Sequence, residues 1–495
     1  MDTRGEPLLV AGADRRLYNR DLAPVPAERR VWTTYNYAAL WIAMAHCIPT
    51  YMLAASLIQN GMDWKEALLT IALGNCIVLV PILLNAHPGT KYGLPFPAFA
   101  RASFGVFGAN VPALLRALVA CGWFGIQTYI GGHAVNILLV VLWPGWAHLF
   151  GGVPLLGLPL PEWITFLSFW ALNLLVVWKG MNAIRIFENW AAPLVLVMTA
   201  GLLVWAIRAA HGLGPITAHR SSLRGFHAFW VVFVPSLNAM IAYWATLSLN
   251  VPDFTRYAKD QRSQALGQAL GLPPTMTAFA GMGVLITSAT VVVFGAPIWD
   301  PVELLARIGE PWVVALGVVG VIIATLSVNI AANVVSPAND FANLWPSRIS
   351  FARGGLITGL VGIAILPWKL LDPRVYVFAW LGGYSTLLGP IAGILIADYW
   401  LVRHAVLDPG DLYRVPGRYY YRKGVNPVAL VALAAGAGTA LVGLVAPPLR
   451  PLFDYGWFVG FAVAFGVYRA LQSTASPASA TSASAASTSS ASGPP

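Results

Sequence analysis

A tryptophan and a glutamine lie four residues apart within a long hydrophobic stretch, residues 110–143. Trp123 and Gln127 project from one side of a helix, because side chains at positions i and i+4 are neighbours there. A flat ring can stack on the indole while its edge forms hydrogen bonds with the amide. An amide that faces lipid is unfavourable. The pair therefore predicts a membrane site for a small, flat, polar molecule.

Two later hydrophobic stretches carry side chains that would complete such a site. Trp244 offers a second aromatic face for the other side of a planar ring. Residues 324–340 form the most polar of these stretches, where Asn333 can both donate to and accept from an amide edge, and Ser327 precedes it. The alternatives are that Trp244 anchors a helix at the membrane interface, and that small residues near Asn333 serve close helix packing.

Ionisable groups at membrane depth are few. Asp253, Asp340 and Asp398 fall near the predicted inner ends of helices, where we expect a solvated or loop-pinning role rather than a proton relay. His46 and His133 lie deeper, and histidine titrates near neutral pH. Each histidine therefore fits either a proton carrier or a structural residue.

The helices that must position these groups carry two internal interruptions. Pro49 removes a backbone donor inside the first hydrophobic stretch, and Pro235 does so inside the sixth. Backbone groups that are freed in a bilayer must line a cavity or be covered by protein. Breaks in the first helix of each half of a five-plus-five arrangement indicate a transporter site. Two ordinary proline kinks are the alternative.

Composition assigns the chain to a membrane. Of its 495 residues, 58% are hydrophobic and 10% are charged, whereas about 25% are charged in a soluble domain. Apolar runs of about 18 to 25 residues are long enough to cross a bilayer. They predict 12 transmembrane helices that start near residues 32, 67, 109, 162, 188, 228, 275, 312, 354, 376, 426 and 452.

The distribution of charge predicts the orientation. If the N-terminus is cytoplasmic, most of the 30 lysines and arginines fall on the inner side, as the positive-inside rule requires. We therefore expect a multi-pass protein of the inner membrane with both termini in the cytoplasm. The net charge of +10 does not indicate a nucleic-acid partner, because such a protein would cluster its basic residues.

One polytopic domain lies between two polar ends. Residues 1–30 are expected to form a disordered or loosely attached cytoplasmic arm, and the Ser/Ala-rich tail 473–495 to be disordered because it cannot bury apolar surface. A short helix at the inner surface is expected over 95–102, and a polar loop over 258–271. The domain is expected to cover 31–472, with repeat one at about 31–208, repeat two at about 228–402 and two extra helices at about 426–472.

Catalytic and metal-binding patterns are not found in the sequence. Cys47, Cys76 and Cys121 all lie in apolar runs, and their spacing matches neither a disulfide framework nor a metal site. We expect a protein that is not an enzyme and has no cofactor.

Four segments together resemble the nucleobase–cation symporter family, which includes bacterial hydantoin, allantoin and uracil carriers and fungal cytosine-purine permeases. The resemblance covers roughly residues 28–470. It implies an all-α integral membrane protein with a five-plus-five inverted repeat, broken helices 1 and 6, two extra C-terminal helices, and alternating access. The segments are GWFGIQ at 122–127, NVPDFTRY at 250–257, NIAANVVSPAND at 329–340 and GPIAGILIADYW at 389–400.

Carried over by position, the family's substrate site falls on residues already singled out. The aromatic sandwich falls on Trp123 and Trp244, and the amide partners fall on Gln127 and Asn333. An amide that is often found in the unwound part of the first helix falls on Cys47. This departure leaves the recognition pattern open, because a thiol cannot offer paired amide contacts.

The resemblance also implies a sodium site. Backbone carbonyls near Ala43 and His46, the carbonyl of Ala324 and the hydroxyl of Ser327 would provide oxygen ligands. The position of a second hydroxyl falls on Val328, whose side chain has no oxygen. Either a water or a backbone carbonyl replaces this ligand, or the coupling ion is H⁺ and His46 carries it.

These patterns predict a secondary symporter that imports a planar nitrogen heterocycle: allantoin, a hydantoin, or a nucleobase such as uracil or cytosine. The expected partners are this small molecule, a coupling cation (Na⁺ or H⁺) and the lipid bilayer. Two alternatives stay open. One is a carrier for a non-planar solute on the same fold, and the other is a sensor that binds substrate without transporting it.

Overall fold

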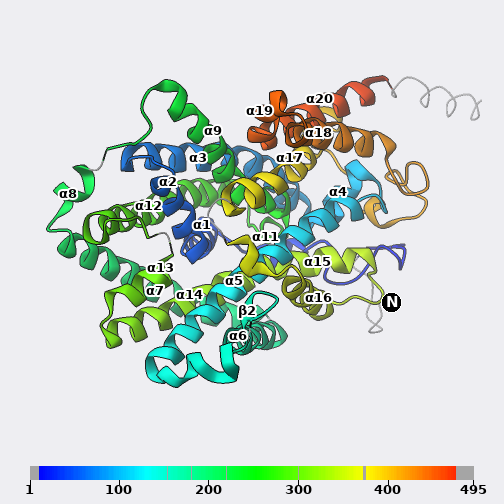
Figure 1. The fold of residues 1–495 in the computed structure, drawn as a ribbon. Helices are drawn as coiled ribbons and strands as arrows, with labels where there is room; N and C mark the ends of the chain where they lie inside the picture. Colours follow the sequence, from blue (N-terminus) through cyan, green and yellow to red (C-terminus); the bar gives the residue numbers. More distant parts are fainter. Residues whose placement is uncertain are drawn as a thin grey trace, which may run out of the picture.

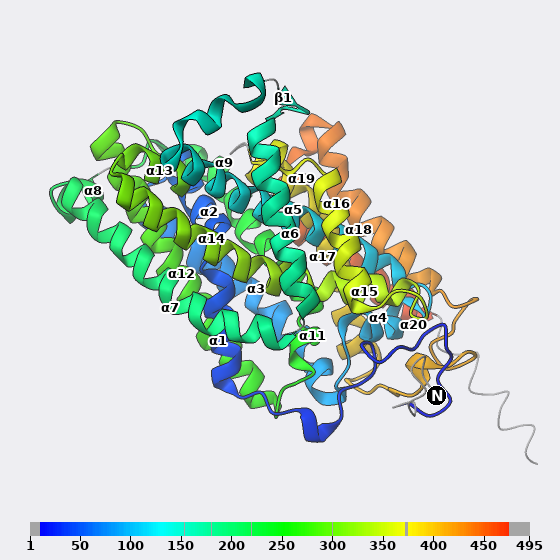
Figure 2. The same ribbon diagram turned by 90° about the horizontal axis from the view of Figure 1, so that it is seen from below.

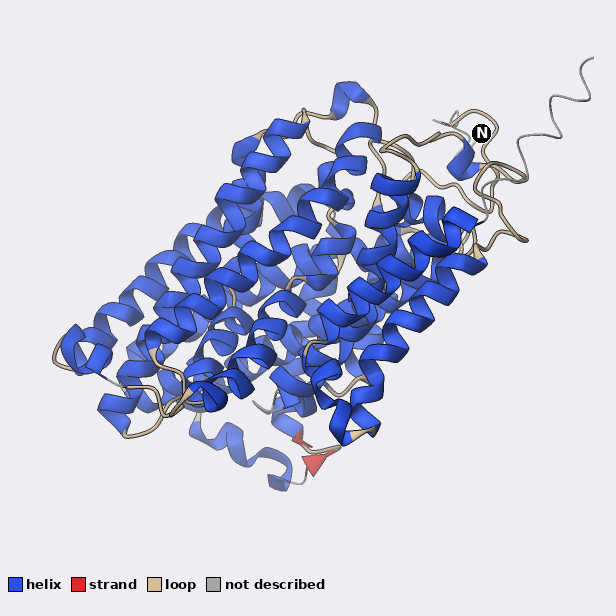
Figure 3. Ribbon diagram, turned by 90° about the horizontal axis from the view of Figure 1, so that it is seen from above, coloured by secondary structure: helices blue, strands red, loops and turns tan. Residues whose placement is uncertain are grey.

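The computed structural model describes residues 10–474 except 153, 180, 219, 299 and 372–374. Long helices lie side by side along most of the molecule (Figures 1 and 3). A small hairpin at one end pairs β1 (Pro154–Leu155) with β2 (Leu158–Pro159) in antiparallel register.

The helices follow one another with short connections. The first half of the domain contains α1 (Thr34–Ala45), α2 (Ile48–Gln59), α3 (Trp64–Tyr92), α4 (Phe96–Phe104), α5 (Asn110–Leu142), α6 (Leu160–Lys179), α7 (Met181–Ala209) and α8 (Leu213–Ala218). The second half contains α9 (Phe226–Tyr243), α10 (Ala245–Asn250), α11 (Pro252–Thr255), α12 (Gln261–Phe294), α13 (Pro301–Ile308), α14 (Pro311–Asn333), α15 (Val335–Leu344), α16 (Phe351–Ala364) and α17 (Gly382–Ile396). The C-terminal part contains α18 (Pro427–Val445), α19 (Arg450–Asp454) and α20 (Gly456–Thr474).

Shorter helical turns join or extend these elements. The tenth of the predicted spans, called span 10 below, combines α17 with π-helical turns on both sides, Val375–Leu381 and Ala397–Val402. The 3-10 turns are Ala27–Arg29, Pro144–Gly152, Pro367–Leu370, Asp411–Tyr413 and Pro447–Leu449.

Several of these helices are long and apolar enough to cross a membrane. Within the described residues there are 8 of them, or up to 9 when the bent pair α1 and α2 counts as one span. Leu196–Ala209 of α7 and all of α16 are shorter apolar helices. The helix α20 packs against α17 and α18 (Figure 1). The chain is thus a multi-pass membrane protein, while the count of 12 spans and the inverted repeat stay predictions.

Both predicted interruptions exist as breaks, but neither lies at its proline. The first break is at His46 and Cys47, where the axes of α1 and α2 differ by 61°. Pro49 lies in the first turn of α2, where a missing N–H is tolerated. Pro235 lies inside the continuous helix α9, and the second break is at Trp244. The prolines therefore predicted correctly which helices are interrupted, but not the residues at which the interruptions lie.

Two expected connections also differ from the structure. Residues 261–271, expected as part of a polar loop, are the first turns of α12, and the Asp260 side chain accepts a hydrogen bond from Ser263 N at the start of this helix (2.7 Å). The short helix predicted over 95–102 is present as α4. All of its residues are buried, because the N-terminal segment and residues 403–426 contact it.

Residues 10–30 pack against the helices and so differ from the disordered or loosely attached arm expected over 1–30. Residues 1–9, and all of the Ser/Ala-rich tail after residue 474, lie outside the described residues. Leu17 and Leu22 are buried. The guanidinium of Arg101 donates to the Leu17 carbonyl (2.8 Å), and that of Arg256 donates to the Asp21 carbonyl (2.8 Å). This segment and the last turns of α20 lie at the same end of the helices (Figure 2).

The three inner aspartates are buried, which contradicts the solvated role expected for them and agrees with the alternative, a loop-pinning role. Asp253 accepts from Phe96 N (3.0 Å) and so ties α11 to α4. Asp340 lies 3.5 Å from Arg116, and both side chains have no exposed surface. Asp398 accepts from Ser103 (2.9 Å) and Tyr468 (2.8 Å) and pairs with Arg403 (2.7 Å). Burial opposes the Arg403 charge, but Asp398 more than offsets it and raises the pKa of Arg403 above its ordinary value.

We expect Asp398→Asn to destabilise the protein strongly, because it leaves a nearly buried guanidinium without its carboxylate. Removal of one partner of a buried pair costs about 3–5 kcal/mol. The measurement is thermal unfolding in detergent. The control is Asp454→Asn, which breaks the exposed pair with Arg450 and should cost about 1 kcal/mol or less. Equal losses in the two variants would contradict the assignment.

Candidate functional site

The two helix breaks meet in the interior. Cys47 is the N-cap of α2, and Tyr243 is the last residue of α9. The Tyr243 hydroxyl lies 3.1 Å from Cys47 Sγ and 2.9 Å from Thr50 Oγ1, and the sulfur lies 3.3 Å from Thr50 Oγ1. We call these three residues the hydroxyl–thiol triad. It joins the broken helix of one half to the broken helix of the other.

An aromatic cluster surrounds the triad. Tyr243 packs edge-on against Trp123 of α5 (5.3 Å between centroids, 82°) and against Trp244 (4.9 Å, 87°). Trp41 of α1 packs edge-on against Trp244 (5.0 Å, 87°). The two tryptophans predicted from the sequence are therefore buried in one cluster, and Tyr243 contacts both of them.

Span 10 closes the cluster on the side of α5. The Trp123 indole N–H donates to the Tyr384 hydroxyl (3.3 Å), which donates to the Ala242 carbonyl (2.8 Å). Trp380 packs against Trp123 at 6.1 Å and 69°. The sequence reasoning missed Tyr243, Tyr384 and Trp380. Only Tyr243 had a usable signal, since it directly precedes Trp244.

The two predicted amides have different surroundings. Gln127 is 3% exposed, and its Oε1 has no hydrogen-bond partner among the described residues. Asn333, at the end of α14, donates to Asn329 Oδ1 (3.0 Å). Asn329 in turn donates to Thr128 Oγ1 (3.1 Å) and Asn173 Oδ1 (3.1 Å). Asn329 thus ties Asn333 to α5 and α6, a role that the sequence did not reveal.

The residues predicted for a cation lie on two helices that pack together. Ala43 and His46 are at the end of α1, while Ala324, Ser327 and Val328 are on α14. Ala324, Ser327 and Val328 are 3%, 6% and 4% exposed. Because the valine side chain has no oxygen, backbone carbonyls and the Ser327 hydroxyl are the groups here that could hold Na⁺. No cluster of three or more His, Cys, Asp or Glu suited to a metal ion occurs among residues described by the structure.

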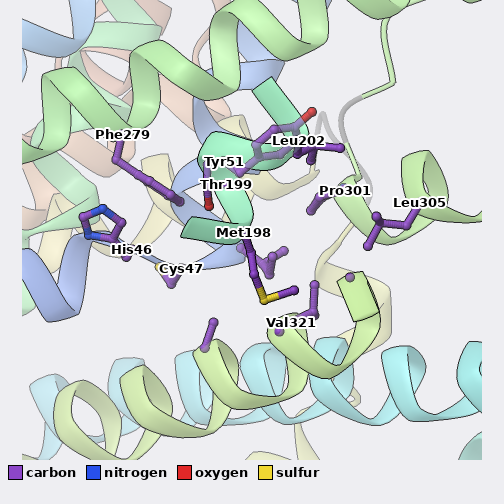
Figure 4. A pocket seen from close by; sticks show the side chains of 14 residues that line it. His46, Cys47, Tyr51, Met198, Thr199, Leu202, Phe279, Pro301, Leu305 and Val321 are labelled. Carbon is purple, nitrogen blue, oxygen red and sulfur yellow. The ribbon is translucent and has the colours of Figure 1, made fainter. Parts of the chain in front are cut away.

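A cavity of about 80 Å³ borders the first helix break (Figure 4). His46 and Cys47 line it together with Met198 of α7, Leu305 of α13 and Val321 of α14 (Figure 4). Ala324 also borders this space, whereas the predicted aromatic and amide residues lie outside its lining. The cavity therefore brings together two residues predicted for the cation, His46 and Ala324, and one predicted for the substrate, Cys47.

His46 is fixed at the edge of this cavity. Its Nδ1 donates to the Ile42 carbonyl (2.5 Å), and its ring packs against Phe279 at 4.5 Å and 50°. His133, the other histidine noted in the sequence, lies elsewhere on α5 and contacts Glu162 (3.3 Å). The structure thus separates the two histidines, and only His46 lies at a helix break.

Known proteins are similar to this chain over nearly its whole length. The family of permeases for cytosine/purines, uracil, thiamine and allantoin matches residues 24–460. The allantoin permease of Bacillus subtilis is 45% identical over 463 residues, 94% of each chain. The purine-uracil permease NCS1 of Arabidopsis thaliana is 43% identical and covers 93% of this chain and 78% of its own.

A solved structure is also similar. Mhp1, a nucleobase-cation-symport-1 family transporter solved in a closed conformation with bromovinylhydantoin bound, has a TM-score of 0.76 and 26% identity. The match covers 92% of this chain and 96% of Mhp1.

We expect Gly122→Ala to disturb the aromatic cluster. A Cβ at this position would lie 2.2 Å from the Trp380 ring, and overpacking of this kind costs about 1–3 kcal/mol. Thermal unfolding and intrinsic tryptophan fluorescence should both change. The control is Gly383→Ala, close to Trp380 in span 10, where no atom lies within 4 Å of the added carbon. This variant should change neither. A Gly122→Ala protein that behaves like the wild type would refute the close contact.

Proposed function

Because the chain belongs to the family of permeases for cytosine/purines, uracil, thiamine and allantoin, we propose that it is a secondary symporter that imports a small planar nitrogen heterocycle. The proposed substrates are allantoin, a hydantoin, or a nucleobase such as uracil or cytosine. The observation that carries the proposal is the buried aromatic cluster at the two helix breaks, where Tyr243 contacts both Trp123 and Trp244.

The chemistry of the cluster supports a planar substrate. Flat rings gain dispersion and stacking energy on indole faces, and a non-planar solute does not need two of them. Gln127 provides a buried acceptor, Oε1, without a partner among the described residues, which a ring N–H would satisfy. Asn333 offers an amide that both donates and accepts. The similarity to an allantoin permease and to a transporter solved with a hydantoin supports the same class.

A cation gradient is proposed to drive uptake. The end of α1 has carbonyls that no longer bond within the helix and carries the negative end of the helix dipole. A cation bound between Ala43 and His46 on α1 and Ala324 and Ser327 on α14 would stiffen these helices against each other. Substrate would then bind at the neighbouring break, and one bundle of helices would rock against the other to change access.

Two other functions are compatible with part of the site. The apolar lining of the cavity beside His46 would suit a carrier for a non-planar solute. The side chain at Val328, which lacks an oxygen, would suit a sensor that binds substrate without ion-driven transport. Counterflow separates the sensor from the symporter, because only a transporter exchanges labelled for unlabelled substrate across the membrane.

The proposed location is the inner membrane with both ends of the chain in the cytoplasm. Support comes from the bias of basic residues and from the packing of residues 10–30 near the end of α20 at one end of the molecule.

We expect Trp123→Ala and Asn333→Ala each to reduce uptake of the transported heterocycle. Loss of one stacking face is worth about 1–3 kcal/mol, and loss of one hydrogen bond about 0.5–1.5 kcal/mol, so the KM should rise more for the tryptophan variant. The assay is uptake of labelled allantoin, hydantoin, uracil and cytosine into proteoliposomes. Wild-type transport of every one of these compounds by both variants would defeat the site assignment.

We expect Val328→Thr to increase the response of uptake to Na⁺, because it restores a hydroxyl where a sodium ligand is missing. The half-saturating Na⁺ concentration should fall by about tenfold, the effect of roughly 1.4 kcal/mol. Na⁺ and pH gradients are imposed separately in the same proteoliposomes. The control is Val318→Thr, the same change at another buried position of α14. A flat Na⁺ response in the Val328 variant would favour H⁺ as the coupling ion.

A further inference from the structure

We propose that Tyr243 determines the specificity of this site, because its hydroxyl reads a carbonyl or N–H on the edge of the heterocycle that faces the break in the first helix. The inference rests on the proposed function and deepens it. It names a recognition residue in addition to the two tryptophans and the two amides.

The position of Tyr243 is the first argument. It is the last residue of α9, so its side chain stands at the break itself. Its ring is edge-on to Trp123 and to Trp244. A planar molecule stacked on either indole would therefore meet the Tyr243 side chain along its rim rather than across its face.

The surroundings of Tyr243 supply the second argument. The indole Nε1 of Trp244 and the Oε1 of Gln127 are buried without a hydrogen-bond partner in the described part of the chain. Native proteins rarely leave buried polar atoms unsatisfied. Trp244 contacts Tyr243, and Gln127 lies one helical turn after Trp123, which also contacts Tyr243. These two atoms therefore point to a polar ligand beside Tyr243. Cys47, a member of the triad, also lines the cavity of Figure 4, so the triad has open volume beside it.

The chemistry of the triad is the third argument. A tyrosine hydroxyl donates one hydrogen bond and accepts others, as a threonine hydroxyl does, while a thiol is weak in both roles. The sulfur and the two hydroxyls lie within 2.9–3.3 Å of one another. The hydrogen bonds among these three groups form a closed circuit, and their direction can reverse. Tyr243 can therefore present either a proton to a carbonyl or a lone pair to an N–H, while the weak bond to Cys47 is given up at small cost.

The test compares oxygen with sulfur on the substrate edge. Full-length protein in proteoliposomes takes up labelled uracil or hydantoin, and uracil, 2-thiouracil, 4-thiouracil, hydantoin and 2-thiohydantoin compete. Sulfur is a weaker acceptor than oxygen. We expect the wild type to prefer the oxygen compound of at least one pair, and Tyr243→Phe to reduce that preference by about tenfold, the value of one neutral hydrogen bond. The ring and its contacts with the indoles remain in this variant.

Tyr37→Phe is the matched control. Tyr37 is 1% exposed and lies on α1, and its hydroxyl donates to the Phe254 carbonyl (3.2 Å) outside the triad and outside the lining of the cavity. It should keep the wild-type preference. An equal loss of preference in Tyr37→Phe and Tyr243→Phe, or no loss in Tyr243→Phe, would overturn the proposal.

A second variant covers the case in which Tyr243→Phe does not fold. Cys47→Ala combined with Thr50→Val removes two groups that compete with the substrate for the Tyr243 hydroxyl, so oxygen compounds should bind several-fold more tightly. An unchanged or smaller oxygen preference there would also overturn the proposal. A wild type that takes up none of the heterocycles would refute the proposed function. Transport by the wild type together with an unaltered oxygen preference in Tyr243→Phe would refute the role of Tyr243 alone.

Discussion

Inside a bilayer a broken helix exposes peptide groups that water cannot satisfy, and this protein places its two breaks against each other. The triad of Cys47, Thr50 and Tyr243 makes that contact. The aromatic cluster depends on it, since Tyr243 packs against both Trp123 and Trp244. All three members of the triad are neutral. Each bond in it contributes only about 0.5–1.5 kcal/mol, so the contact can be broken and remade without a large energetic penalty. The proposed rocking of one helix bundle against the other needs a junction with that property.

Other polar networks in the molecule are stable structural contacts. Asn329 ties α14 to α5 and α6 through side chains that are all buried. Asp398 receives bonds from Ser103 and Tyr468 and pairs with Arg403. Buried networks of this kind are strong when they are fully satisfied and costly to open. The charged anchor at Asp398 and Arg403 is thus distinct from the weak, neutral contacts at the breaks. On the proposed mechanism, that difference provides a rigid frame around a movable site.

Much of this arrangement could be predicted from the sequence, and the errors have physical causes. The prolines identified the broken helices but not the break residues, because proline is tolerated in a first turn, as at Pro49, and inside a membrane helix, as at Pro235. The first turns of α12 resemble a loop, because polar side chains there satisfy one another rather than solvent. Side chains elsewhere in the protein donate hydrogen bonds to backbone carbonyls of the N-terminal segment, and such backbone contacts leave no trace in residue types.

By itself the sequence determined the class of the protein. Long apolar runs must span a membrane as helices. The distribution of basic residues predicts their orientation, and a tryptophan and an amide one turn apart predict a helix that faces a ligand. Only the tertiary structure decided which side chains meet. Tyr243 joins Cys47 and Thr50 from a position almost two hundred residues away. No local pattern encodes such a contact, because it arises only when the helices of the two halves pack.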